Sequence, residues 1–436
     1  MNKSVSGSAV HGTLSHAWRA LRHHNFRLYF FGQGISLIGN WMTRLATTWL
    51  VYRLTHSALL LGVVGFAGQI LSFLLGPFAG VWVERLNRRK LLLWTQAAAA
   101  VQSLAMAALT LTHVITLWEI VALAAVQGMI NAFDMPGRQS FLVQMVEDRN
   151  DLSNAIAINS SMANGARLIG PAIAGLVIAA IGEGWCFLID GVSYFAVIAS
   201  LLLMRLSSVA VRRHASTMLE QMREGWDYVR NFRPIRTILL LFALISLMGY
   251  SYAVLLPLFA AQVLHGGPAT LGWLTGASGV GALVSALSLA IRKSVVGLTR
   301  MVQIAAAMLG GGLILFGLSH VLWLSLVLMV FVGFGLMQCA SASNTIIQSL
   351  VAEDKRARVM SYYTMAFFGA APFGSLLAGV LAHRIGAPYT VIFTGAFCIA
   401  GSLWFTFDLP RVHAVMRPIY QEMGLLSARD PLSPVP

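Results

Sequence analysis

The stretch from Ser57 to Trp82, SALLLGVVGFAGQILSFLLGPFAGVW, decides the fold class of this chain. It carries no charged residue, and it exceeds the roughly 20 mostly apolar residues that a helix needs to cross the hydrocarbon core of a bilayer. Comparable stretches follow one another along the sequence. Cutting the chain at its charged and Gly/Pro-rich breaks predicts about twelve spans, near residues 27–52, 57–82, 91–112, 116–136, 154–181, 185–206, 236–262, 269–291, 300–318, 321–349, 357–382 and 386–408.

The composition supports a membrane protein. Hydrophobic residues make up 57% of the 436 residues and charged residues only 11%, whereas soluble proteins carry about 25% charged residues. A soluble domain of this size has too little interior to hide so many apolar helix faces. We therefore predict an all-α membrane protein.

The net charge of +14 raises the question of nucleic-acid binding, and the distribution of the basic residues answers it. If both termini lie on one side, only Arg53 and Arg384 of the 30 Lys and Arg fall in loops of the other side, and only Arg44 and Arg167 fall inside spans. By the positive-inside rule the termini are cytoplasmic, and we expect a multi-pass protein of the bacterial inner (plasma) membrane. The basic surplus then contacts anionic lipid, and no nucleic-acid partner is expected.

The sequence offers little for a catalytic or metal site. No stretch matches the phosphate-binding loop with its Gly-Lys-Ser/Thr ending, so we expect no ATP motor. The three cysteines lie in apolar runs, and the histidines at predicted outer ends stand singly. Enzymes need clustered reactive groups. We predict no catalytic residue, no metal and no cofactor, and we expect the proton-motive force to supply the energy.

The sequence contains two halves that resemble each other. Leu61-Gly62 recurs in the second half as Leu271-Gly272, and Gly175 recurs as Gly379. Such duplication is typical of secondary transporters, whose substrate sites lie between the repeats near the midplane. We predict a cytoplasmic segment at 1–25, a six-helix bundle at 26–206, a linker at 207–235, a second six-helix bundle at 236–409 and a cytoplasmic tail at 410–436.

The linker shows a helical pattern of its own. Leu219, Met222, Trp226 and Val229 repeat at helical spacing with charged residues between them. This pattern predicts an amphipathic helix on the inner leaflet. The alternative is a disordered linker.

Polar stripes mark the spans that face a water-filled path, because a helix surrounded by lipid is apolar on all sides. Spans 1, 4 and 10 carry such stripes, which we assign to the substrate and proton path together with Asp190 of span 6: Gln33, Asn40, Arg44, Glu119, Gln127, Asn131 and Gln338. Asp134 and Arg138 continue the stripe of span 4. Hydrogen bonds between helices are the alternative explanation for milder stripes.

Arg44, Asp190 and Glu119 are the intramembrane charges of greatest interest. At about 1.5 Å per residue, they lie roughly 12, 7 and 4 Å from the outer ends of their spans. One interpretation is a structural Arg44-Asp190 pair. The other is that Arg44 attracts an anionic solute while Glu119 or Asp190 exchanges a proton. For Arg167, on one face with Asn164 and Pro171, we favour a structural tie between helices over substrate contact.

The loop between spans 2 and 3 reads Gly80-Val-Trp-Val-Glu84-Arg85-Leu-Asn87-Arg88-Arg89-Lys90. It resembles the signature loop of the major facilitator superfamily, Gly-x-x-x-Asp-Arg-x-Gly-Arg-Arg/Lys, with Glu84 for the Asp and Asn87 for the second Gly. The resemblance implies a gating role for Gly80, Glu84, Arg85, Arg88 and Arg89, with Glu84 near the N-terminus of span 11. An ordinary positive-inside loop is the alternative.

Three further stretches resemble one branch of that superfamily, the bacterial drug:proton antiporters that include the enterobactin exporter. They are Asn25-Phe-Arg-Leu-Tyr29, Ala132-Phe-Asp-Met-Pro136-Gly-Arg138-Gln139 and Asn164-Gly-Ala-Arg167-Leu-Ile-Gly170-Pro171-Ala-Ile-Ala-Gly175. The last partly matches the antiporter motif of span 5, with Ala174 in place of one glycine. This match implies export and places Asp134, Arg138, Arg167, Gly170 and Pro171 among the residues that control the conformation.

The expected function is export of a small amphipathic or anionic compound of the drug or siderophore class, by proton antiport with alternating access of two pseudo-symmetric bundles. Import or lipid movement on the same fold is the first alternative, and a membrane sensor that transports nothing is the second. The expected partners are the small-molecule substrate and membrane lipid, with the chain acting as a monomer.

Overall fold

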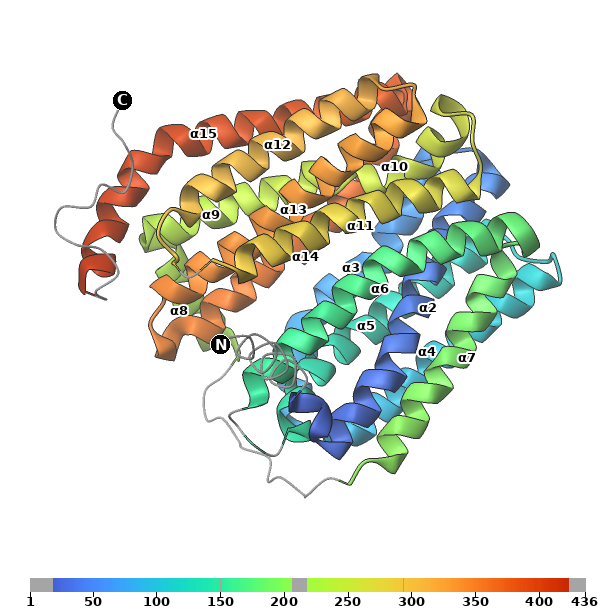
Figure 1. The fold of residues 1–436 in the computed structure, drawn as a ribbon, viewed down its shortest axis with the longest axis horizontal. Coiled ribbons are helices and arrows are strands. Elements are labelled where there is room, and N and C mark those ends of the chain that lie inside the picture. The colour runs from blue at the N-terminus through green and yellow to red at the C-terminus, as the bar shows by residue number, and fades with distance from the viewer. Residues whose placement is uncertain (1–18, 147, 149–150, 206–217, 293, 423–436) are drawn as a thin grey trace, which may run out of the picture.

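The computed structural model describes residues 19–146, 148, 151–205, 218–292 and 294–422, and every regular element within these ranges is helical (Figure 1). A short 3₁₀ turn, η1 (Arg19–Arg22), leads into the first half. The six long helices of that half are α2 (His24–Thr55), α3 (Ala58–Arg85), α4 (Arg88–Leu111), α5 (Leu117–Met145), α6 (Leu152–Ile181) and α7 (Glu183–Leu203).

The second half also contains six long helical segments. The first of them is broken into α9 (Arg233–Leu244), η3 (Ile245–Gly249), α10 (Tyr252–Leu258) and η4 (Phe259–Val263). The other five are α11 (Pro268–Ala290), α12 (Leu298–Leu318), α13 (Leu322–Leu350), α14 (Glu353–Ile385) and α15 (Ala387–Glu422). The linker contributes α8 (Met218–Asn231).

Eleven helices of the described part are long and apolar enough to cross a membrane. The first predicted span, α2, is not among them, because Gln33, Asn40 and Arg44 lower its hydropathy. It nevertheless runs between α6 and α7. The prediction of an all-α membrane protein with two six-helix bundles is confirmed.

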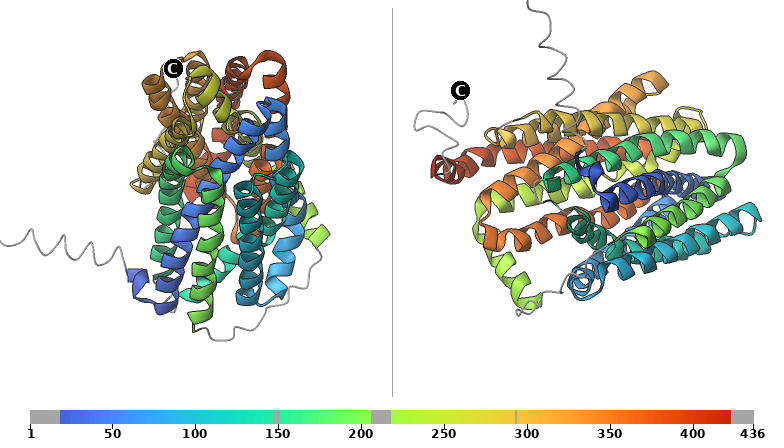
Figure 2. Two further views of the ribbon diagram at one scale, coloured as in Figure 1. Left: turned by 90° about the vertical axis from the view of Figure 1, so that its right-hand side faces the viewer. Right: turned by 60° about the horizontal axis from the view of Figure 1, so that its bottom comes forward.

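The end of the molecule that carries η1, α8 and the loop between α3 and α4 is called the linker end, and the opposite end is called the far end. Figure 2 shows α8 at the linker end in its right-hand view. There α8 packs on α14 and α9, with an ion pair between Arg358 and Glu224 and the rings of Trp226 and Tyr362 6.0 Å apart. The linker helix therefore contacts the second bundle directly.

The two halves meet through two glycine crossings. A Cβ atom on Gly62 of α3 would lie 2.9 Å from Cα of Gly379 on α14, and one on Gly175 of α6 would lie 3.0 Å from Cα of Gly272 on α11. Absence of side chains lets these backbones touch. The four residues are the repeated glycines of the sequence, so each glycine of one repeat packs on a glycine of the other.

Both crossings lie toward the far end. Nearer the linker end, a Cβ on Gly76 of α3 or Gly165 of α6 would meet no described atom within 4 Å. Figure 1 shows the two bundles converging toward the far end and separating toward the linker end. The structure is thus closed at the far end.

Candidate functional site

Asp190 is the most deeply buried carboxyl group in the middle of the first half. Its residue is 1% exposed. The Oδ2 atom accepts hydrogen bonds from the Thr43 hydroxyl at 2.9 Å and from the Ser103 hydroxyl at 3.1 Å. The Oδ1 atom has no partner among the described residues. Asp190 therefore connects α7 to α2 and α4 through neutral donors.

The predicted Arg44-Asp190 pair is not formed. Thr43 is the residue of α2 that turns toward Asp190, and its neighbour Arg44 points around the helix to another side. Arg44 is an exposed residue, and its guanidinium lies over the ring of Trp41, 5.1 Å from the centroid. Adjacent helix positions differ by 100°, so one of the two residues could face α7, but not both.

Arg167 of α6 shares the same indole ring. Its guanidinium lies 5.7 Å from the Trp41 centroid, within the range of cation–π attraction. We call Trp41, Arg44 and Arg167 the arginine–tryptophan cluster. Neither arginine forms an ion pair with a carboxylate in the described part of the chain.

The depth of this cluster makes its charge significant. Counted back from the far ends of α2 and α6 at 1.5 Å per residue, Arg44 and Arg167 lie roughly 16 and 21 Å deep. A cation near the middle of a membrane is costly unless water or an anion compensates it. The cluster is therefore a place where an anionic group would be stabilised.

Gly170 positions the cluster. A Cβ on Gly170 would lie 2.6 Å from Cβ of Trp41 and 3.0 Å from the Ile38 carbonyl oxygen. Gly170 thus brings α6 against α2 within one half, whereas the carbonyl of Pro171 faces Gly272 of the other half. The two residues, which the resemblance assigned together to control of the conformation, thus lie at two different interfaces.

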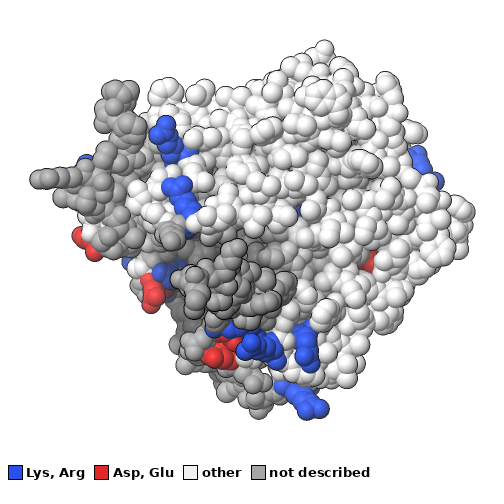
Figure 3. Space-filling model, in the orientation of Figure 1, with Lys and Arg blue, Asp and Glu red and all other residues white. Residues whose placement is uncertain are grey.

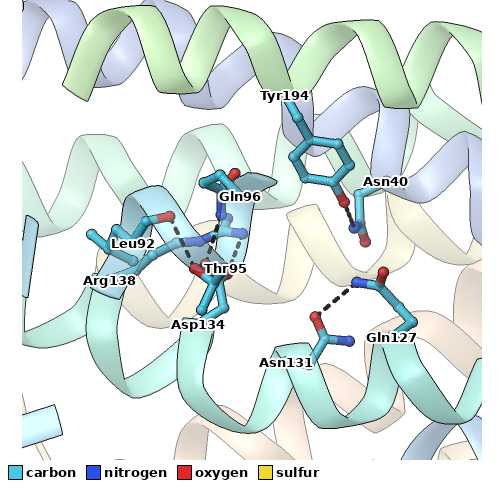
Figure 4. A network of polar contacts seen from close by, with 9 residues as sticks. All are labelled: Asn40, Leu92, Thr95, Gln96, Gln127, Asn131, Asp134, Arg138 and Tyr194. Carbon is cyan, nitrogen blue, oxygen red and sulfur yellow. Dashed lines mark hydrogen bonds and ion pairs between the residues drawn. The ribbon is translucent and has the colours of Figure 1, made fainter. Parts of the chain in front are cut away.

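Asp134 and Arg138 form an ion pair on α5 (Figure 4). Asp134 also accepts hydrogen bonds from the Thr95 hydroxyl at 2.9 Å and from the Gln96 amide at 2.6 Å. These partners belong to α4, so the network ties α4 to α5 inside the first half. It makes no contact with the second half among the bonds that the described residues form.

Asn40, Gln127 and Asn131 lie near this network. Asn40 donates to the Tyr194 hydroxyl oxygen at 3.1 Å, and Gln127 donates to the Asn131 side-chain oxygen at 3.1 Å. In Figure 4, Asn40 and Gln127 point toward one another from α2 and α5. These amides form a polar surface shared by α2 and α5. Both helices carry polar stripes that we assigned to the substrate and proton path.

Gln33, Gln338 and Glu119 have different surroundings. Gln33 is buried and neither of its amide atoms has a hydrogen-bond partner among the described side chains and backbone. Gln338 accepts from Ser285 at 2.8 Å and from Ser288 at 3.2 Å, which ties α13 to α11. Glu119 accepts from the Thr116 backbone N–H at 2.7 Å and closes a capping box at the start of α5. This contact explains the Glu at position 119 by its role in the helix cap.

The predicted gating loop is described in part. The side chains of Arg88 and Arg89 donate to the carbonyls of Ser140, at 3.5 Å, and Leu202, at 2.8 Å. Both arginines thus fasten the start of α4 to the linker-end parts of α5 and α7. The side chains at Gly80, Glu84 and Arg85 lie outside the described residues.

Several residues of this region were not singled out from the sequence: Trp41, Thr43, Thr95, Gln96, Ser103 and Tyr194. Two of them carried a usable signal. Trp41 stands three residues before Arg44 and Tyr194 four after Asp190, spacings that share a helix face. The hydroxyl donors carried none, because Thr and Ser are common in spans. Among the described residues, no group of His, Cys, Asp and Glu could hold a metal ion.

Known proteins place the chain among transporters. It is 26% identical to the staphyloferrin A transporter of Staphylococcus aureus over 87% of this chain and 95% of that one. It is also 26% identical to the multidrug efflux pump Tap of Mycolicibacterium fortuitum over 89% and 94%. The fold is similar to a POT family transporter solved with a thioalcohol-conjugated peptide, with a TM-score of 0.72, 13% identity and coverage of 89% and 96%.

The model of one family covers almost the whole chain. Residues 15–424 match the model of the transmembrane secretion effectors, a family of the major facilitator superfamily. The relatives are transporters rather than enzymes. The resemblance found in the signature loop and in spans 4 and 5 is therefore confirmed, and the chain belongs to the transmembrane secretion effector family of major facilitator efflux transporters.

Proposed function

We propose that this efflux transporter exports a small amphipathic or anionic solute of the drug or siderophore class in exchange for protons. Relatives named for a siderophore, for several drugs and for macrolides set this range. The arginine–tryptophan cluster supports the anionic end of the range, because two unpaired guanidinium groups favour an acid group on the solute. The indole ring beside them offers an apolar surface.

The observation that carries the proton part of the proposal is the environment of Asp190. A buried carboxylate is costly unless a cation or several donors compensate it. Asp190 has two hydroxyl donors and one oxygen without a partner in the described structure. Such a group suits reversible protonation, and we assign it the role of proton carrier. Glu119, occupied as a helix cap, is not part of this proposal.

The two sites are linked through α2. Thr43 donates to Asp190, and the next residue, Arg44, belongs to the arginine–tryptophan cluster. A solute that pulls on Arg44 moves the backbone that holds Thr43, and so changes the donors of Asp190. Coupling then needs no long pathway, because the two residues are adjacent on one helix.

The proposed orientation places the linker end in the cytoplasm, with both termini on that side, in a bacterial inner membrane. The distribution of Lys and Arg supports it, and Figure 3 shows charged residues gathered toward the linker end of the visible face. A far end closed by two glycine crossings then leaves the cytoplasmic side for solute loading. Both halves come from one chain, which supports a working monomer.

Inside-out proteoliposomes with an acidic lumen test direction and charge preference together. The probes are 8-anilinonaphthalene-1-sulfonate, an aromatic anion, and ethidium, an aromatic cation. We expect accumulation of the anion that collapses when a proton ionophore is added. Accumulation that occurs only in right-side-out vesicles would indicate an importer, and accumulation that ignores the ionophore would refute proton coupling.

A further inference from the structure

An apolar groove of about 490 Å³ lies where the two halves meet on one side of the molecule. Residues 168–176 of α6 form one wall, residues 273–280 of α11 form the floor, and residues 326–330 of α13 form the other wall. Every residue that lines it is apolar. The transport proposal above makes no use of this groove.

The groove faces the membrane. Trp273 of α11 is 55% exposed and Leu176 of α6 is 57% exposed, although both belong to helices that are able to span a membrane. The same face of α11 continues in exposed Val284 and Leu287. Ser278, on the opposite face, is buried and bonds to Tyr252 of α10 at 3.0 Å. The groove therefore opens away from the interior of the protein.

Its depth corresponds to one leaflet. Counted from the start of α11 at 1.5 Å per residue, Trp273 lies roughly 8 Å and Val280 roughly 18 Å from the far end. The hydrocarbon core is about 30 Å thick, or about 15 Å for each leaflet. The groove thus runs along the membrane normal through the leaflet at the far end, which is the outer leaflet in the proposed orientation.

A comparison of the two repeats shows that the groove is a feature of one side of the molecule. The offset that takes Leu61-Gly62 to Leu271-Gly272 takes Phe66 to Gly276. On the other side of the molecule, Phe66 of α3 packs edge-to-face on Phe373 of α14, with ring centroids 5.8 Å apart. The crossing of α3 and α14 is therefore covered by the protein's own rings, whereas the crossing of α6 and α11 has a glycine at the equivalent position.

We propose that the groove binds one acyl chain of a membrane phospholipid. Hydrocarbon is what surrounds this face of the spans, and a lining without polar side chains offers nothing to a head group or to a charged solute. At the crossing of α6 and α11, the acyl chain would make the contacts that Phe66 and Phe373 make at the crossing of α3 and α14. Because α6 and α11 belong to different halves, an occupied groove stabilises the conformation in which these halves touch.

Gly276→Phe is the variant that tests the proposal. A Cβ at this position would lie 3.7 Å from the Leu168 carbonyl oxygen and 3.9 Å from Cβ of Ala172, which is ordinary contact, so the phenyl ring can enter the groove without moving a helix. Gly276→Ala is the first control, because a methyl group leaves most of the groove open. Val284→Phe is the second, because it adds the same ring to the exposed face of the same helix outside the groove.

The experiment uses the full chain in vesicles of phosphatidylethanolamine and phosphatidylglycerol that contain a trace of phosphatidylglycerol with a diazirine in the middle of one acyl chain. After illumination, labelled peptides are identified by mass spectrometry. We expect label concentrated in 168–176, 273–280 and 326–330, lost in Gly276→Phe and retained in both controls.

Two results would overturn the assignment. The groove holds no specific acyl chain if the label is spread evenly over all exposed helix faces, or if the label is unchanged in Gly276→Phe. Label displaced by 8-anilinonaphthalene-1-sulfonate or ethidium, in competition at one site, means that the groove is a solute path instead. Folding of each variant is checked by its elution as a single species before reconstitution.

Discussion

The Asp190 side chain holds three helices of the first half together through hydroxyl donors and without a cation. Thr43 of α2 and Ser103 of α4 supply these donors, and Gly39 of α2 leaves the space, since a Cβ there would lie 2.8 Å from the Asp190 carboxylate. A change in the spacing of α2 and α7 alters the Thr43 hydrogen bond and the Gly39 contact together. Protonation and helix position are thus connected at a single residue.

The arginine–tryptophan cluster leads to a prediction about solute charge. Arg44→Gln or Arg167→Gln should raise the KM for the anionic dye by about 10- to 100-fold, because a hydrogen bond to a charged group contributes about 1.5–3 kcal/mol and 1.4 kcal/mol corresponds to a factor of ten. Initial rates of dye uptake into inside-out vesicles measure this. Arg384→Gln is the matched control, since Arg384 is exposed in the last turn of α14 at the far end. An equal loss for the cationic dye would assign the arginines to structure instead.

The Asp134-Arg138 pair leads to a prediction about folding. Removing one partner of a buried ion pair costs about 3–5 kcal/mol, because the other charge stays uncompensated. Asp134→Asn and Arg138→Gln should each lower the thermal stability of the purified protein. The double variant should recover part of the loss, since it leaves no unpaired charge. Additive losses in the double variant would show that the two residues act independently.

At the scale of elements, the glycine crossings set the distance between the halves. An added methyl group at Gly62 would lie 2.7 Å from the Ser375 carbonyl oxygen, and a backbone atom cannot turn aside as a side chain can. Gly62→Ala should therefore push α3 and α14 apart at the far end. Spin labels at His56 and His383, measured by pulsed electron paramagnetic resonance, should report a longer mean distance than in the parent.

Gly76→Ala on the same helix is the control for that experiment, because an added Cβ there meets nothing described within 4 Å. It should leave the distance unchanged. If Gly62→Ala and Gly76→Ala give the same distance distribution as the parent, the far end is not held by the crossing of α3 and α14.

The positions of the spans could be predicted from the sequence, because the bilayer selects long apolar helices and few other structures. Their ends were less predictable. The last span was expected to stop at residue 408, yet α15 continues to Glu422. Asp408 pairs there with Arg233 and accepts from Thr237 at 2.8 Å, and Met416 and Tyr420 beyond it are buried. The charge of Asp408 suggested the end of the last span, but in the structure Asp408 is paired within the helix bundle.

The partners of the polar side chains could not be predicted for a different reason. The sequence shows which residues share a helix face, but the rotation of that face depends on packing against other helices. One of the two interpretations of the sequence paired Arg44 with Asp190, because both lie in the outer half of their spans. The rotation of α2 instead brings Thr43 to Asp190 and Arg44 to Trp41. Close contacts at two glycines set this rotation: Gly39 of α2 lies against Asp190 of α7, and Gly170 of α6 lies against Trp41 of α2.

At the scale of the whole molecule, the two halves share a plan but differ in chemistry. Arg44, Arg167, Asp190 and the Asp134-Arg138 pair all lie inside helices of the first half. In the second half, Asp408 of α15 is paired with Arg233 of α9. The buried polar contacts of α13 in the second half are between neutral groups, as at Gln338 and Ser285. We expect the first half to bind solute and proton, and the second half to close over it through the two glycine crossings.

Proton movement driven by solute tests the central claim most directly. The claim is that Asp190 carries the proton exchanged for solute. The measurement follows the pH inside inside-out proteoliposomes with an internal dye while 8-anilinonaphthalene-1-sulfonate is added, and compares the parent with Asp190→Asn and with Glu119→Gln. Asn keeps the size of Asp and still accepts from Thr43 and Ser103, so the fold should be retained. The account predicts that Asp190→Asn moves no protons and still exchanges labelled dye for unlabelled dye, whereas Glu119→Gln behaves as the parent. Proton movement by Asp190→Asn at the rate of the parent would contradict it.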